Sequence, residues 1–141
     1  MRQFAKARKF SNSRINWVKA PDVKKRVSGL VRNLEIDWIK TSRIFAYRSV
    51  KSKTRAYARI WGLNSLWQRT LNVEPAYIVE VLSEHYDHLP ETEKDKVLLH
   101  ELTHIPKNFS GALVPHIRHG KRNFHRKVDS LIELYFQKMR K

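Results

Sequence analysis

Apolar positions recur at helical spacing over residues 22–40, near the start of the chain. They form one stripe among lysines and arginines, which predicts an amphipathic helix ending at about Lys40. Asp22 follows Pro21 and is placed to cap this helix at its start. The stripe consists of Val23, Val27, Leu30, Leu34 and Trp38.

Two more helices are predicted in the second half of the chain. One begins near Thr92, which can cap it together with Asp95, and stops at Ile105 because Pro106 disfavours helix before it. Residues 107–120 carry glycines and a proline and are expected to form a loop. The last helix covers residues 123–141, with Phe124, Val128, Leu131, Ile132 and Tyr135 on its apolar side.

Between the first two helices the pattern changes to short runs rich in β-branched and aromatic residues. Residues 43–50, 54–63 and 76–83 predict about three strands, mainly antiparallel, whereas residues 64–71 carry no clear pattern. The fold class expected is therefore α+β, with a small sheet between an N-terminal helix and two later helices. A chain of 141 residues without repeats or glycine-rich linkers predicts a single domain, 1–141. Residues 1–20 of this domain are expected to form a basic N-terminal arm.

The charge of the chain is strongly positive and unevenly distributed. The formal net charge is +16, and residues 1–59 alone carry 17 Lys and Arg against three acids, a net +14. Such a field attracts polyanions, nucleic acid first, although a solvated basic face has the same composition.

The second predicted strand suggests where nucleic acid would bind. Arg55, Tyr57, Arg59 and Trp61 alternate with small or aliphatic residues, so one face would interleave arginines with aromatic rings, as surfaces for single-stranded nucleic acid do. Alternatively, the aromatic rings pack on the first helix and the arginines extend past them. The candidate nucleic-acid contacts are Arg55, Arg59, Lys51 and Lys53.

The chain contains no cysteine, which removes disulfides, thiolate nucleophiles and cysteine-based zinc modules. Any metal ion must therefore be held by histidine and carboxylate side chains. No run approaches the roughly 20 apolar residues of a membrane span, and the basic N-terminus lacks an apolar core. We expect a cytoplasmic protein without a membrane partner.

The second predicted helix carries a His-Glu-x-x-His motif at His100, Glu101 and His104. A spacing of four places the two imidazoles one turn apart on the same helix face, where both can bind one zinc ion. Glu101 lies beside them and can act as general base towards a water that the zinc acidifies. The alternative is two histidines that are hydrogen-bonded or face solvent.

A catalytic zinc site requires a third protein ligand and an open position. His116 and His119 follow in the loop, which brings them back towards the motif, whereas His125 falls within the last helix. The third ligand is predicted to be His116 or His119.

Four segments of the sequence are similar to a metallopeptidase family of archaea and phages, and more distantly to SprT-like proteases. They are YRSVKSKTRAYARIWGL, PAYIVEVLSEHYDHL, HELTHIPKNFSGALVPH and RKVDSLIELY, and the likeness covers most of the chain, from about residue 22 to 138. The resemblance implies a minimal zincin fold, with the motif on an active-site helix and a further histidine from the loop or the following helix.

The resemblance aligns the third ligand in two ways. In SprT-like proteases the last histidine comes fifteen positions after the second motif histidine and precedes a glycine, which matches His119 and Gly120. The family's Gly-x-Leu-x-Pro-His pattern, beginning at Gly111, points to His116 instead.

The leading prediction is a zinc metallopeptidase that acts on proteins or peptides. A second hypothesis is a nucleic-acid-binding protein with a structural zinc, and the two combine into an SprT-like protease recruited to DNA or RNA. A hydrolase of other esters or amides is the third, since zinc-activated water attacks all of these bonds.

Overall fold

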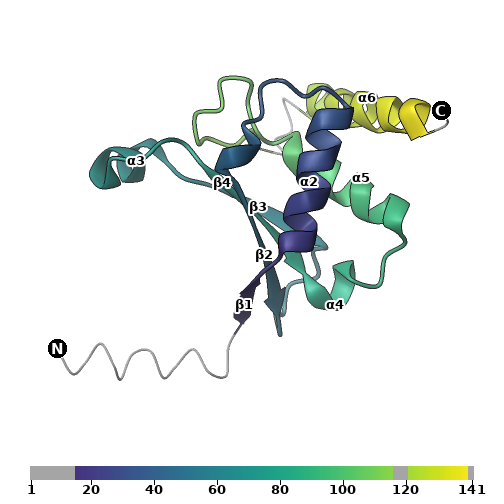
Figure 1. Ribbon diagram of the computed structural model, residues 1–141, viewed down its shortest axis with the longest axis horizontal. Coiled ribbons are helices and arrows are strands. Elements are labelled where there is room, and N and C mark those ends of the chain that lie inside the picture. Colours follow the sequence, from purple (N-terminus) through teal and green to yellow (C-terminus); the bar gives the residue numbers. More distant parts are fainter. Residues whose placement is uncertain (1–14, 116–120, 140–141) are drawn as a thin grey trace.

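The computed structural model describes residues 15–115 and 121–139, and for residues 121–128 it describes the backbone only (Figure 1). Its centre is a four-stranded mixed sheet with the strand order β1-β2-β4-β3. The strands are β1 (Asn16–Lys19), β2 (Ile44–Val50), β3 (Ala58–Gly62) and β4 (Tyr77–Leu82). The α+β class is confirmed, with four strands where the sequence indicated about three.

Strand pairing differs from the predicted antiparallel order at the centre of the sheet. β1 with β2 and β3 with β4 are antiparallel, but β2 and β4 are parallel. The chain leaves β2, forms β3 at the edge and returns to place β4 between them. β4 can occupy this position because it is apolar along most of its length, which suits a strand with neighbours on both sides.

The fourth strand, β1, comes from the segment expected to belong to the basic arm. Its four residues, Asn-Trp-Val-Lys, pair with the second half of β2 and are exposed to solvent on both faces. A strand this short and exposed shows no burial pattern that would separate it from a loop.

The long helices lie on one side of the sheet (Figure 1). The long ones are α2 (Pro21–Asn33), α5 (Glu91–Leu102) and α6 (Lys121–Met139), with a 3-10 turn η2 (Thr41–Arg43) before β2. α2 packs on β2, α5 packs on β3, and α5 also contacts α2 and α6. Their apolar sides and the inner face of the sheet form one core, whose fully buried members include Val27, Val79, Val81, Leu98 and Leu99.

The first helix is shorter than its apolar stripe. It ends at Asn33, where Glu35 adopts a left-handed φ of 55° and the N–H of Ile36 bonds to the carbonyl of Val31 at 3.0 Å, a Schellman termination. Trp38 therefore lies beyond the helix and packs at the edge of the core. At the start Ala20 is the N-cap, and no side chain caps the helix. The carboxylate of Asp22 binds Arg48 instead.

Two short helices complete the fold. α3 (Ser65–Leu71) forms from the segment without a clear pattern and is capped by Asn64, whose side chain accepts the N–H of Trp67 at 2.9 Å. It projects from the body of the molecule between β3 and β4 (Figure 1). α4 (Ser83–Tyr86) follows β4 directly. No helix in the described part of the chain is long and apolar enough to cross a membrane.

Candidate active site

The end of α5 brings the motif histidines together. His100 lies in the last turn of the helix, which ends at Leu102 rather than at Ile105 as predicted. The N–H of His104 still bonds to the carbonyl of Glu101 at 3.1 Å, so the backbone continues as a tight turn beyond the helix. The two imidazole rings lie 5.5 Å apart between centroids, at 72° to one another. The helical spacing of the motif therefore makes the rings direct neighbours.

A backbone carbonyl orients the ring of His104. Its Nδ1 lies 2.5 Å from the carbonyl oxygen of Val114. A carbonyl only accepts, so Nδ1 carries a proton and donates this hydrogen bond. The side chain is nearly buried, with 8% of the residue exposed. This is the arrangement by which metal-binding histidines are oriented through their second nitrogen.

The turn itself is held by a buried threonine. The hydroxyl of Thr103 donates to the carbonyl of His100 at 2.6 Å, and its N–H bonds to the carbonyl of Leu99 at 3.2 Å. Thr103 is completely buried. These bonds satisfy the last carbonyls of α5 and fix the backbone that carries both histidines.

Glu101 lies between the two histidines in sequence and is largely shielded from water. Burial raises the pKa of its carboxyl group to about 7. A carboxyl group that titrates near neutral pH can both take up and return a proton, as a general base in hydrolysis must.

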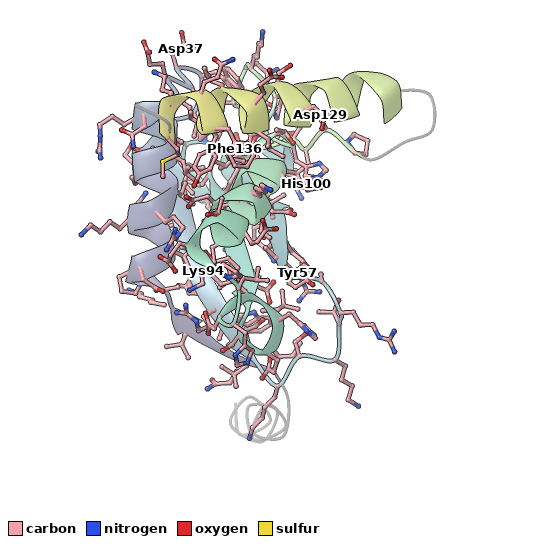
Figure 2. All side chains as sticks on the ribbon, turned by 90° about the vertical axis from the view of Figure 1, so that its right-hand side faces the viewer. Asp37, Tyr57, Lys94, His100, Asp129 and Phe136 are labelled. Atoms are coloured by element: carbon pink, nitrogen blue, oxygen red, sulfur yellow. The ribbon has the colours of Figure 1, made fainter. Side chains whose placement is uncertain are left out.

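An open cleft of about 410 Å³ lies beside His100 and Glu101. One wall is formed by residues 56–58, at the start of β3, and another by Ile132 of α6. In Figure 2 His100 lies between Asp129 of α6 and Tyr57, on the face of the molecule turned to the viewer. β3 is an edge strand, which pairs with β4 alone among the strands of the described region. The cleft therefore lies beside the beginning of an edge strand.

The loop that follows the motif is clasped by Tyr77 of β4. The tyrosine hydroxyl accepts the N–H of Gly111 at 2.8 Å and donates to the carbonyl of Ala112 at 2.8 Å. Gln68 of α3 donates to the carbonyl of Ser110 at 2.8 Å. The chain leading towards the predicted third ligand is thus attached to the sheet at several points.

Two glycines allow this attachment. Gly111 has a φ of 94°, and a Cβ atom there would overlap the carbonyl oxygen of Leu63 and the amide of Gln68. A Cβ on Gly62 would overlap the carbonyl oxygen of Gly111. Sequence analysis missed the roles of Tyr77 and Gln68, because their partners lie 34 and 42 residues away. The glycine after the motif was the one local signal of a close backbone approach.

The histidine pair fits a metal ion such as zinc, which accepts imidazole nitrogen and needs no cysteine. His116 and His119 lie outside the described residues, as does the side chain of His125. Within the described ranges no group of three or more His, Cys, Asp or Glu side chains could hold a metal. The third ligand therefore remains a prediction.

A match to a protein family decides how these features are read. Residues 15–134 match the model of the family described as "Putative phage metallopeptidase". The chain belongs to this family. The resemblance to a metallopeptidase family of phages is thereby confirmed, and membership of it implies a metal ion and a protein or peptide substrate. Comparisons with curated proteins and with solved structures found no match.

The four candidate nucleic-acid residues differ in their exposure and in their contacts. Lys51, Lys53 and Arg55 are exposed in the segment between β2 and β3. The strand predicted for residues 54–63 included Arg55, but β3 begins only at Ala58. Arg59 lies on β3, where its guanidinium binds both carboxylate oxygens of Glu80, at 3.2 and 3.1 Å. Arg59 is therefore already engaged within the sheet.

Proposed function

We propose that the protein is a zinc-dependent peptidase in which His100, His104 and either His116 or His119 hold the metal. The observation that carries the proposal is the proximity of the His100 and His104 rings, whose centroids lie 5.5 Å apart, with the His104 ring fixed by its hydrogen bond to the Val114 carbonyl. The neighbouring carboxyl group of Glu101, whose pKa burial raises to about 7, supports a catalytic role for the pair.

In this proposal the residues divide the work. Zinc, when bound, supplies the positive charge that acidifies water and polarises the scissile carbonyl. Glu101 takes the proton from the attacking water and returns it to the leaving amine, which its raised pKa suits. The cleft beside Glu101 holds the substrate.

The position of this cleft beside an edge strand suits an extended peptide. A strand edge can pair with an added strand through main-chain hydrogen bonds, and residues 56–58 at the start of the edge strand form one wall. This favours peptides over small esters as the substrate class. It also accounts for Tyr57 in the wall, where a ring can contact a substrate side chain.

Metal analysis combined with a cleavage assay tests the proposal. The zinc-loaded protein is expected to bind one zinc ion and to cleave unfolded casein. Glu101→Gln should keep the zinc and lose cleavage by about 100-fold or more. Glu93→Gln is the matched control, because Glu93 is an exposed residue of the same helix, paired with Lys96. A Glu101→Gln protein as active as wild type would exclude the general-base role.

A further inference from the structure

The face of the sheet opposite the helices is uncovered and carries aromatic rings. In Figure 1, α2, α4, α5 and α6 lie on one side of the strands, and no helix formed by residues 15–115 or 121–139 covers the other side. Paired residues on adjacent strands share a face, so the register places Trp61, Ile78 and Phe45 together on this outer face, with Tyr47 one step along. Trp17 of β1 completes the group and is 56% exposed.

We propose that this face binds a single-stranded polynucleotide, with bases stacked on Trp17, Tyr47 and Trp61. The site lies on the opposite side of the sheet from α5 and its histidine motif, and the proposal does not depend on peptidase activity.

A buried carboxylate holds the two tryptophans in place. Glu80 of β4 is 1% exposed, and it accepts the indole N–H of Trp17 at 3.1 Å and that of Trp61 at 2.8 Å. Burial alone would raise the pKa of Glu80, but the hydrogen bonds from Arg59, Trp61 and Trp17 hold the pKa below its usual value. The carboxylate is thus ionised, and it fixes both rings at their polar edges.

The fixed rings leave their apolar surfaces exposed. Trp61 is 49% exposed, and with Trp17, Tyr47 and Ile78 it lines an open groove of about 390 Å³. A ring that is anchored at its edge loses little freedom when a planar group stacks on its face. Every nucleic-acid base offers such a planar group, and four-stranded sheets with exposed aromatics stack about two or three bases.

Charge selects a polyanion as the occupant. Among the outward-facing residues of the four described strands, Glu80 is the single acid, and Arg59 neutralises it while lying 5.5 Å from the Trp61 ring centre. Lys19 faces the same side, opposite Tyr47. The segment after β2 adds three exposed cations, and residues 1–14, which lead into β1, contain five Lys and Arg and no acid.

This arrangement suits a strand of nucleic acid better than a second protein copy. Two copies packed through this face would bring like charges together, whereas phosphates would be neutralised by them. In a duplex the bases are already stacked on one another inside the helix and their faces are not accessible. A flat aromatic surface therefore favours unpaired bases. The exposed residues Lys51, Lys53 and Arg55 are assigned to phosphates, and the aromatic rings are assigned to bases.

Binding is tested with labelled 20-nucleotide oligothymidylate and oligouridylate, measured by fluorescence anisotropy at two salt concentrations against a 20-base-pair duplex. Trp17→Ala, Trp61→Ala and Tyr47→Ala should each weaken single-strand binding by about tenfold or more, with the salt dependence unchanged. Trp61→Phe, which keeps a ring, should retain most of the affinity. Tyr47→Ala leaves the hydrogen bonds to Glu80 intact. A loss of single-strand affinity in this variant therefore cannot arise from a Glu80 carboxylate that has lost its hydrogen-bond donors.

The matched control is Trp67→Ala on α3, because Trp67 is similarly exposed, at 54%, but belongs to the projecting helix. It should bind like wild type. Equal affinity of the three sheet variants and wild type would overturn the proposal, as would failure of wild type to bind either oligonucleotide. A wild-type dimer that the sheet substitutions convert to monomers without changing oligonucleotide affinity would also overturn it.

Discussion

His104 and Val114, ten residues apart in the sequence, are joined by two hydrogen bonds. The Nδ1 of the His104 ring donates to the Val114 carbonyl, and the N–H of Val114 donates to the His104 carbonyl at 2.7 Å. The loop between them is therefore closed directly at the motif. The chain reaches Pro115 beside the histidine pair, which is where a further ligand would have to come from.

Removing the metal should destabilise the protein measurably. A ligand that binds only the folded state adds about 4 kcal/mol when it is present at 1,000 times its Kd. Treatment with a chelator should thus lower the melting temperature, and zinc should restore it. In His100→Ala the melting temperature should not respond to zinc. A wild-type protein whose melting temperature is the same with and without chelator would contradict metal binding at this site.

The stability of the metal-free protein should depend on pH through Glu101. The folded pKa of about 7 exceeds the ordinary value of 4.5, so between these values the folded protein holds a proton that the unfolded chain has released. The free energy of unfolding should then fall as pH rises from about 4.5 to 7. Glu101→Gln should remove this fall and be more stable at pH 8, by up to about 3 kcal/mol.

Urea unfolding of both chelated proteins at pH 4.5 and pH 8 measures this effect. The two should have similar stability at the lower pH, where the folded-state carboxyl group is protonated. Parallel pH dependences of wild type and Glu101→Gln would mean that the carboxyl group is not buried as described.

Two glycine substitutions should have opposite effects on stability. Gly111→Ala introduces a Cβ at a φ of 94° against the carbonyl of Leu63, and should cost about 2 kcal/mol or more and weaken zinc binding. Gly29→Ala lies within α2, where the nearest atom to a new Cβ is 4.0 Å away, and should stabilise by about 0.5–1 kcal/mol. Thermal unfolding and zinc titration of both variants test the pair; a stable, zinc-binding Gly111→Ala protein would contradict the close approach.

The clasp by Tyr77 should couple the loop to the metal site. Tyr77→Phe leaves the N–H of Gly111 and the carbonyl of Ala112 without their partner, and should cost about 1–3 kcal/mol. Zinc affinity should fall as well, because the loop carries Val114 and leads to the third ligand. Tyr135→Phe, which loses a hydrogen bond to Asp95 instead, should lower stability but leave zinc affinity unchanged. Equal zinc affinities of the two variants would contradict the prediction that the contacts of Tyr77 with the loop affect the metal site.

Local patterns in the sequence predicted the helix that carries the motif and the proximity of its histidines, but not its bounds: Pro90 rather than Thr92 is the N-cap, and the helix ends at Leu102 rather than Ile105. The i, i+4 spacing brings His100 and His104 together in any helix, and Pro106 limits the helix wherever the rest of the chain lies. The apolar stripe of α2 is also a local pattern, but the helix was predicted to end at about Lys40 and ends at Asn33. The left-handed backbone at Glu35 has no glycine to signal it.

Long-range features could not be read in this way. The parallel pairing of β2 with β4 depends on where β3 goes, and no local pattern encodes it. β1 is a strand only because β2 offers an edge to it. The clasp of Tyr77 and the bond from His104 to Val114 likewise join segments whose proximity is created by the fold.

The most direct test is a crystal structure of the zinc-soaked protein with the metal located by anomalous scattering. We predict one ion bound by Nε2 of His100 and Nε2 of His104, with the Nδ1 of His104 still donating to Val114, and with His116 or His119 as the third ligand. An ion bound elsewhere, or motif rings that point apart with no metal between them, would contradict the account.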